Sequence, residues 1–301
     1  MSDYIISIQG TPEGARLALI LALVSALAHA SFGALQKGRH DPWLSRAAID
    51  VCYGLLALPL ALIFAPLPDG EMWLILGGAM VIHAVYKLLQ AMAYTRGAYT
   101  VVYPVARGTS PLVTVALATV VFQEHFTGPQ WGGVALLSGG IMALALVNMR
   151  GHPLGWRDMA PALWLAAATG VLIAIYTTYD AWGIRLAQDP LTFLLWYFVV
   201  DSWFIPVIVA RRMARSGAPL PPFAPLAIRG MSGAVIAFVS FGSVMMATRL
   251  DKVGEAAALR ETSVIFATLI GFFLLREGSW QRRLGAAVVM AVGIALIGLN
   301  A

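Results

Sequence analysis

Long hydrophobic runs separated by short polar turns account for almost the whole of this 301-residue chain. A helix needs roughly 20 mostly apolar residues to cross about 30 Å of hydrocarbon. Ten runs meet that requirement, at about 17–36, 46–66, 72–94, 99–122, 130–149, 160–183, 190–210, 224–247, 254–275 and 283–300. The pattern predicts an all-α polytopic membrane protein with ten transmembrane helices and leaves no segment for a soluble domain.

One half of the pattern repeats the other. The segment 92–141 reappears without a gap at 245–294, and each matching pair lies 153 positions apart. A repeat of this length in a membrane protein indicates a duplicated chain. We therefore divide the chain into a first five-span repeat, residues 1–150, and a second, residues 151–301. The retained pairs include Thr95 and Thr248, Arg107 and Arg260, Glu124 and Glu277, and Gly140 and Gly293.

Basic residues concentrate in alternate loops. Only four fall on one side of the predicted membrane, namely Arg16, Arg185, Arg249 and Lys252. Twelve fall on the other: Lys37, Arg39, Arg46, Arg96, Arg150, Arg157, Arg211, Arg212, Arg215, Arg276, Arg282 and Arg283. The side richer in Lys and Arg faces the cytoplasm, so both termini are expected on the periplasmic side of a bacterial inner membrane. Because each half has five spans, the second half should be inverted, with a pseudo-two-fold axis in the membrane plane.

Composition agrees with this class, since 59% of the residues are hydrophobic and 12% are charged. The net charge of +5 could suggest a nucleic-acid partner. The bases, however, lie in short loops where they set topology, and we expect no nucleic-acid binding. The single cysteine, Cys52, allows no intrachain disulfide and no thiolate metal cluster.

Sequence patterns of common enzymes are missing. There is no Gly-x-x-x-x-Gly-Lys-Ser/Thr phosphate loop, so ATP is not expected to drive the protein directly. The five histidines are scattered singly, which gives no metal-ligand spacing. We expect neither an enzyme nor a bound metal or cofactor.

Polar residues inside the predicted spans are the candidates for function, because charged groups at membrane depth are costly and tend to face protein or water. In the third span, His83, Tyr86, Lys87 and Gln90 form one polar stripe at helical spacing. Ser243 of the eighth span stands 153 positions after Gln90. The stripe predicts a substrate-binding surface, although Lys87 could instead pair structurally with Asp50 or Asp201.

A second candidate surface lies on the fourth span. Tyr99, Tyr103 and Arg107 share one helical face, and an arginine fork can bind a carboxylate through two hydrogen bonds. The repeat pair Arg107 and Arg260 could equally be architectural, since both halves retain it.

The sixth span supplies the third surface, formed by Tyr176, Tyr179 and Asp180. Asp180 is the first candidate for an ion-coupling or proton site, with Asp201 as the second. The alternative is a structural pairing of Asp180 with a buried arginine or lysine.

Ten spans in two inverted halves, with Pro-Val-Ala-Arg-Gly-Thr-Ser-Pro at 104–111 and Ala-Leu-Arg-Glu-Thr-Ser-Val at 258–264, resemble the drug/metabolite transporter superfamily. The EamA-like family, with its YddG-type amino-acid exporters, is the branch that the chain resembles. The resemblance implies a central cavity lined by spans one to four and six to nine that opens alternately to each side. It also implies export.

These observations predict an inner-membrane transporter that exports small metabolites, and hydrophobic or aromatic amino acids are the substrates we expect. Tyrosines would form an apolar wall, and Lys87 and Arg107 would bind a carboxylate. The expected partners are the small-molecule substrate and the lipid bilayer, with the protein a monomer or homodimer. Two alternatives stay open: a multidrug or quaternary-ammonium efflux transporter, and a membrane scaffold or receptor that transports nothing.

Overall fold

The computed structural model describes residues 2–35, 41–150, 155–217, 222–273 and 280–299, and in these ranges every regular element is an α-helix. The helices are α1 (Ser2–Ile8), α2 (Pro12–Leu35), α3 (Pro42–Phe64), α4 (Gly70–Arg96), α5 (Tyr99–Val121), α6 (Gly128–Arg150), α7 (Trp156–Leu186), α8 (Pro190–Asp201), α9 (Phe204–Ser216), α10 (Phe223–Leu250), α11 (Val253–Arg260), α12 (Ser263–Phe273) and α13 (Trp280–Gly298).

Eight segments within the described ranges are long and apolar enough to cross a membrane. They correspond to the first eight predicted spans, with α8 and α9 together forming the seventh. The predicted ninth and tenth spans correspond to α11 with α12 and to α13, which are shorter. The expected class, an all-helical protein with many spans, is confirmed, and the count of ten stays a prediction.

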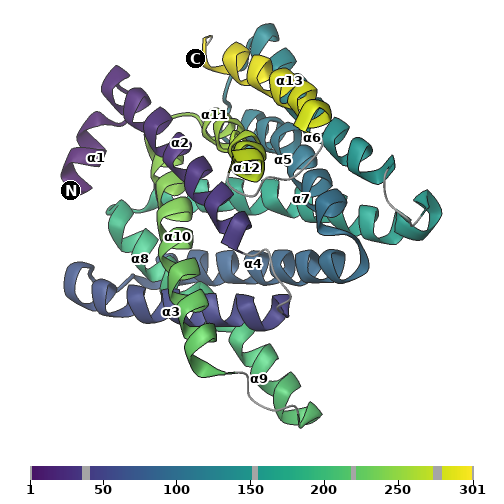
Figure 1. Ribbon diagram of the computed structural model, residues 1–301. Helices are drawn as coiled ribbons and strands as arrows, with labels where there is room; N and C mark the ends of the chain where they lie inside the picture. The colour runs from purple at the N-terminus through teal and green to yellow at the C-terminus, as the bar shows by residue number, and fades with distance from the viewer. Residues whose placement is uncertain (1, 36–40, 151–154, 218–221, 274–279, 300–301) are drawn as a thin grey trace.

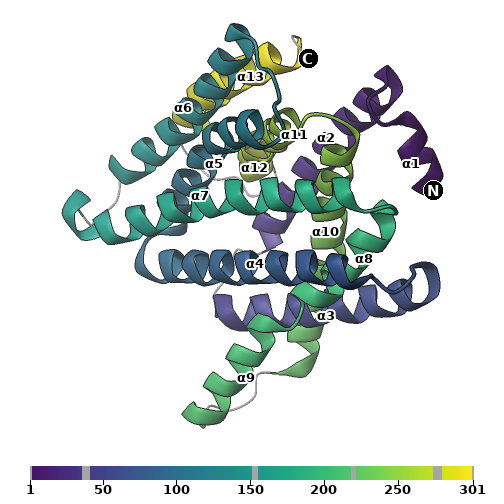
Figure 2. The ribbon, with the colours of Figure 1, turned by 180° about the vertical axis from the view of Figure 1, so that it is seen from behind.

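The helices pack into a bundle in which distant parts of the chain lie side by side. Figures 1 and 2 show α3, α4 and α7 running in adjacent rows, with α10 crossing them. Helix α10 packs along α2 and α3, whereas α7 packs between α4 and α5. Helices α6 and α13 pack against each other at one edge (Figure 1).

The α6–α13 contact depends on glycine. A Cβ atom on Gly133 would lie 2.6 Å from the carbonyl oxygen of Gly293, and a Cβ on Gly293 would lie 2.6 Å from that of Gly133. No side chain fits at such a distance, so glycine lets the two backbones touch, as small residues do between membrane helices.

Helix α5 runs unbroken through Pro104. A proline cannot donate to the carbonyl four residues earlier, here that of Thr100, so this oxygen needs another partner. The side chain of Asn148 in α6 donates to it at 2.7 Å. The neighbouring helix thus satisfies the group that the proline frees, as membrane helices require.

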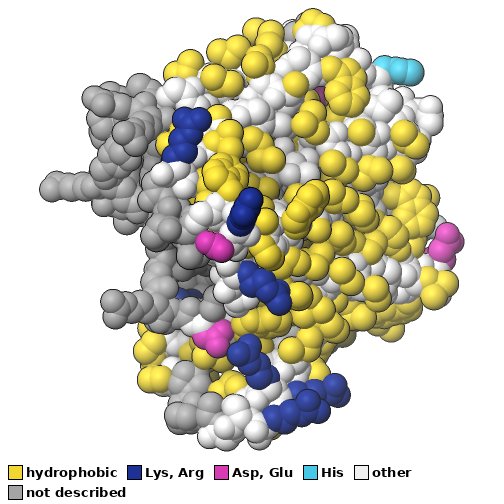
Figure 3. Space-filling view, turned by 90° about the vertical axis from the view of Figure 1, so that its right-hand side faces the viewer, with side chains coloured by type: hydrophobic (Ala, Val, Ile, Leu, Met, Phe, Trp, Pro, Cys, Tyr) yellow, Lys and Arg dark blue, Asp and Glu magenta, His cyan; other side chains and the backbone are white. Residues whose placement is uncertain are grey.

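The outer surface fits a lipid environment. Figure 3 shows hydrophobic side chains covering a broad face, with Lys and Arg side chains gathered toward one border. Many large apolar residues on the membrane-length helices are exposed, among them Leu55, Ile63, Leu74 and Trp164. Because such exposure is unfavourable in water, these residues are best explained as contacts with lipid.

Candidate substrate cavity

A central cavity opens between the helices, and its empty space of about 1370 Å³ includes the part open to the outside. Residues from α2 to α5 and from α7 to α11 line it, and none of its lining residues belongs to the described parts of α6 or α13. Eight of the residues predicted to bind substrate lie on its wall: His83, Tyr86, Lys87, Gln90, Tyr99, Tyr103, Arg107 and Tyr176. Asp201 and Arg260 also lie there.

Three predicted residues do not line this cavity. The hydroxyl of Tyr179 lies against Gly78 of α4, where an added Cβ would be 2.2 Å away. Asp180 lies behind the wall on a smaller adjoining cavity. Ser243 lines neither space. The helical spacing of Tyr176, Tyr179 and Asp180 identified the helix correctly, but their side chains point to different neighbours.

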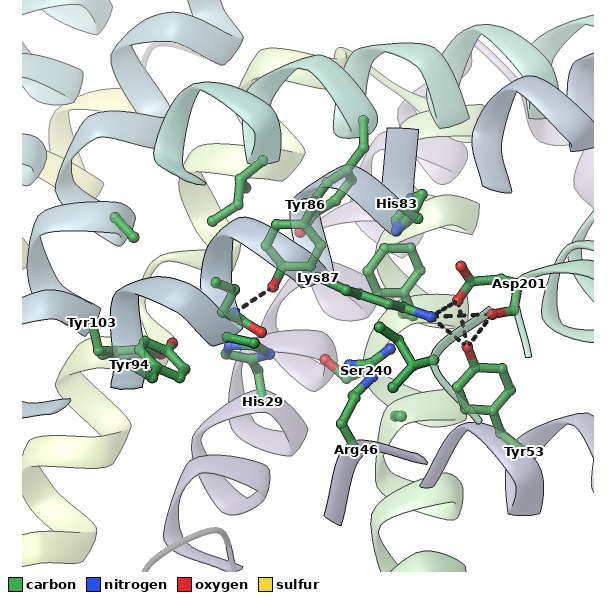
Figure 4. Close-up of a pocket in the computed structure, with 18 of the residues that line it drawn as sticks. His29, Arg46, Tyr53, His83, Tyr86, Lys87, Tyr94, Tyr103, Asp201 and Ser240 are labelled. Atoms are coloured by element: carbon green, nitrogen blue, oxygen red, sulfur yellow. Dashed lines mark hydrogen bonds and ion pairs between the residues drawn. The ribbon is translucent and has the colours of Figure 1, made fainter. Parts of the chain in front are cut away.

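Lys87 lies at the centre of a buried ionic cluster (Figure 4). Its Nζ is 2.9 Å from Asp50 and 2.8 Å from Asp201, and it donates to the Tyr53 hydroxyl at 3.1 Å. Arg46 completes the cluster with an ion pair to Asp50 at 2.7 Å. The structural pairing considered for Lys87 is therefore present with both aspartates, although the side chain still faces the cavity.

The cluster forms where the seventh predicted span is interrupted. Helix α8 ends at Asp201 and α9 begins at Phe204. The break leaves the carbonyl of Asp201 without a helical partner, and this oxygen accepts from Lys87 at 3.1 Å and from Tyr53 at 3.2 Å. Unwound backbone at membrane depth is tolerated where protein groups satisfy it, and Lys87 does so here.

Aromatic rings cover much of the remaining wall. Tyr99 stacks on Tyr103 with ring centroids 5.2 Å apart, and Tyr94 meets Tyr99 edge to face at the same distance. Near α10, the rings of Tyr176 and Tyr197 lie 5.8 and 5.7 Å from that of Phe241. The cavity therefore offers aromatic faces and hydroxyl groups together.

The two repeat-related arginines differ in their surroundings. Arg107 pairs with Glu261, with 3.0 Å between Nε and the carboxylate, and contacts Ser263 at 3.3 Å. Arg260 is 4% exposed and makes no ion pair among the described residues. Its one hydrogen bond there is a long one to the Tyr176 hydroxyl at 3.5 Å. Arg260 thus places on the cavity wall a guanidinium that makes no ion pair with the described residues.

Asp180 pairs with a histidine rather than with an arginine or lysine. His83 Nε2 lies 2.8 Å from Asp180 Oδ2, and the Tyr197 hydroxyl lies 3.2 Å from His83 Nδ1. The same hydroxyl lies 3.0 Å from His83 Nε2, and the carboxylate, which can only accept when ionised, favours a proton on Nε2. The pair lies between the two cavities, with His83 on the larger one and Asp180 on the smaller.

Several lining residues were not predicted from the sequence. Tyr197 and Phe241 lie on hydrophobic runs of the seventh and eighth predicted spans. Arg46 was assigned to a loop, yet it lies in the first turns of α3. Its spacing of four residues from Asp50 was the available sign that both belong to one helical face.

At the ends of the helices away from Tyr99, hydrogen bonds tie both halves together. The Glu124 carboxylate accepts from the backbone N–H groups of Val253 and Gly254 at 2.7 and 3.1 Å. Arg185 contacts Glu124 at 3.3 Å and donates to the carbonyls of Thr248 and Asp251. A carboxylate at a helix N-terminus is favourable. Its repeat partner Glu277 lies outside the described residues.

Asp189 caps α8 outside the membrane spans. Its carboxylate accepts from the backbone N–H groups of Leu191 and Thr192 and from the hydroxyl of Ser2 in α1. Burial would raise the pKa of this carboxyl, but the hydrogen bonds from Ser2, Thr192 and the backbone outweigh burial, so its pKa lies below the ordinary aspartate value. The described residues contain no group of three His, Cys, Asp or Glu side chains able to hold a metal ion.

Comparison with known proteins agrees with a transporter fold. No curated protein matches this chain. A solved structure described only as "Crystal structure of protein" superposes with a TM-score of 0.75, covering 94% of this chain and 99% of the other. At 15% identity this likeness shows the fold alone. Residues 16–146 match the EamA-like transporter family, so this part of the chain is an EamA-like transporter domain.

Proposed function

We propose that this protein is a secondary transporter that exports hydrophobic or aromatic amino acids across the bacterial inner membrane by alternating access. The observation that carries the proposal is the cavity wall around Arg260. A buried guanidinium with no carboxylate partner in the described structure can bind a carboxylate, and the aromatic wall beside it suits an apolar side chain. Amphipathic acids combine these two features.

The contacts between α6 and α13 support the inverted repeat. Gly133 contacts Gly293, and Gly140 contacts Ala286. The repeat relates positions 153 apart, so the partner of Gly133 is Ala286 and the partner of Gly293 is Gly140. Replacing each residue of the first contact by its partner therefore gives the second contact. Residue numbers rise along one helix as they fall along the other, so the helices are antiparallel. A two-fold axis relating antiparallel helices lies across them, as an inverted repeat requires.

Alternating access is supported by the unequal ends of the cavity. It reaches Trp43 and Tyr99, which lie at the first turns of α3 and α5. At the other end, Arg185, Glu124 and the first turn of α11 form the hydrogen-bonded closure described above. We assign the open end to the cytoplasm, because Lys and Arg predominate in the loops on that side.

The same assignment puts both chain ends in the periplasm. Alkaline phosphatase fused after Ala301 should therefore be active, and green fluorescent protein at the same position should remain dark. Alkaline phosphatase inserted between α9 and α10, after Gly217, is the matched control and should be inactive. An active loop fusion with an inactive terminal fusion would reverse the orientation.

The transport proposal is tested with purified full-length protein in liposomes. Labelled phenylalanine, tryptophan, leucine and glutamate are each supplied with and without a pH gradient. Saturable exchange of the first three, and much slower exchange of glutamate, is expected. Exchange of tetraphenylphosphonium in their place would favour a quaternary-ammonium efflux transporter. No saturable flux of any of these compounds would favour the scaffold or receptor alternative.

A further inference from the structure

We propose that Asp180 and Arg260 bind the two charged groups of a zwitterionic substrate, with the ammonium at Asp180 and the carboxylate at Arg260. The inference rests on the proposed function and specifies its substrate. Phenylalanine, tryptophan and related amino acids carry both charges on groups attached to one carbon, next to an apolar side chain. The substrate would thus place its charged end beyond the aromatic wall and its side chain within it.

Both residues line the smaller cavity, together with Tyr176, Thr177, Phe241 and Thr248. Tyr176, Phe241 and Arg260 also line the large cavity, so the two spaces adjoin. An opposite pair of charges on one small cavity, next to a wide aromatic one, matches the shape and polarity of such an amino acid.

Each of the two side chains has a buried polar atom without a partner. Asp180 Oδ1 and Arg260 Nε make no hydrogen bond within the described structure, and the residues are only 2% and 4% exposed. Leaving such groups unpaired costs free energy, and in native proteins they call for a specific explanation. One atom accepts and the other donates, so an ammonium and a carboxylate are their complements.

The other charged groups nearby are paired elsewhere: Glu261, whose carboxyl interacts electrostatically with Arg260, forms its ion pair with Arg107 at 3.0 Å. Lys87, on α4, pairs with Asp201 of α8 at 2.8 Å. On Asp180 itself, His83 occupies only Oδ2, and the tyrosine hydroxyls of Tyr176 and Tyr197 contact Arg260 and His83, respectively. Helix α10 contributes only uncharged groups to the cavity, Phe241 and Thr248 among them. Asp180 Oδ1 and Arg260 therefore remain for the substrate.

The same arrangement links substrate to protons. A proton taken up by the Asp180 carboxylate cancels the negative charge that would attract the ammonium, so proton and ammonium compete for one site. Exchange of one proton for one substrate follows without a second ion site. Inward proton movement could then drive export.

The experiment compares three ligands on the intact protein in detergent: L-phenylalanine, 3-phenylpropionate, which lacks the ammonium, and 2-phenylethylamine, which lacks the carboxylate. Binding is measured as the ligand-dependent rise in unfolding temperature. Wild type should bind phenylalanine about tenfold or more tightly than either analogue, since each charged hydrogen bond is worth about 1.5–3 kcal/mol. Asp180→Asn should weaken phenylalanine to the level of 3-phenylpropionate and leave that analogue unchanged. Arg260→Gln should weaken the binding of phenylalanine to the level of 2-phenylethylamine and leave the binding of that amine unchanged.

The retained binding of one analogue shows that each variant is folded. Asp180→Glu and Arg260→Lys keep the charges and should still prefer phenylalanine over both analogues. Two results would overturn the zwitterion site even if wild type exchanges phenylalanine in liposomes. One is that a neutral variant loses the binding of all three ligands equally. The other is that wild type binds all three ligands equally. Absence of that exchange in wild type would instead overturn the proposed function, and this inference with it.

Discussion

Arg107 and Arg260 occupy equivalent positions in the two repeats, yet one is paired and the other is not. Arg107 lies within unbroken α5 and pairs with Glu261. Arg260 ends α11, directly before the break at Glu261 and Thr262. The break directs Glu261 toward the arginine of the other repeat and leaves Arg260 facing the cavity. At the two equivalent sequence positions, one arginine thus forms an ion pair and the other forms none with the described residues.

The sequences around the two arginines also differ. The first repeat has Pro104 and Pro111, whereas the second has Ala257 and Val264. Contrary to the usual effect of proline, the helix with prolines is continuous and the one without them is interrupted. Packing against neighbouring helices therefore outweighs local propensity here, as it often does in buried helices.

The largest effect on stability is expected from breaking the ion pair of Arg107 with Glu261. Arg107→Gln removes the ion-pair partner of the buried Glu261 carboxylate, and removing one partner of a buried ion pair costs about 3–5 kcal/mol. The variant should unfold at a clearly lower temperature in detergent. The double variant Arg107→Gln, Glu261→Gln should recover most of the loss, because it removes both charges of this ion pair. A double variant as unstable as the single one would contradict the pairing.

Arg260→Gln should have the opposite sign on stability. It removes a buried charge that has no ion-pair partner in the described structure, so the desolvation cost of that charge disappears. We expect a free energy of unfolding equal to that of wild type or higher by up to about 1 kcal/mol, together with a severe loss of phenylalanine exchange. A strongly destabilised Arg260→Gln would show that the residue holds the fold together, as Arg107 does.

These expectations could not all come from the sequence. Helical spacing identified the polar stripe of Tyr86, Lys87 and Gln90, because periodicity alone decides which residues share a face. Spacing cannot show which distant helix faces that stripe. The partners of Lys87 and Asp180 come from α3, α8 and α4, and the interruptions after Asp201 and Arg260 depend on tertiary contacts. Pairing across helices, rather than the helices themselves, is what the sequence left open.

A smaller and more selective effect is expected at Asp180. Asp180→Asn keeps the shape of the side chain and its contact with His83 but carries no charge that a proton could cancel. At saturating phenylalanine, downhill exchange in liposomes should persist, while a pH gradient should no longer drive accumulation. His83→Gln is the companion variant and should weaken the coupling in the same direction. Accumulation by Asp180→Asn at the wild-type level would assign Asp180 a structural role, and the transporter would then act without a coupling ion.

The smallest effect is expected at Asp189, which extends the comparison to a carboxylate near water. Because hydrogen bonds hold its pKa below the ordinary value in the folded protein, its contribution to stability is complete above about pH 4, the usual range of an unfolded aspartate. That contribution is lost as the pH falls through the lower folded value. Asp189→Ala should reduce stability by no more than about 1 kcal/mol at pH 7, the typical value of a helix N-cap. The difference from wild type should shrink in acid, and unfolding measured at pH 7 and near pH 3 checks this. A loss of stability as large as that of Arg107→Gln would contradict the comparison. It would mean that a partly exposed charge contributes as much to the stability of this protein as a buried one.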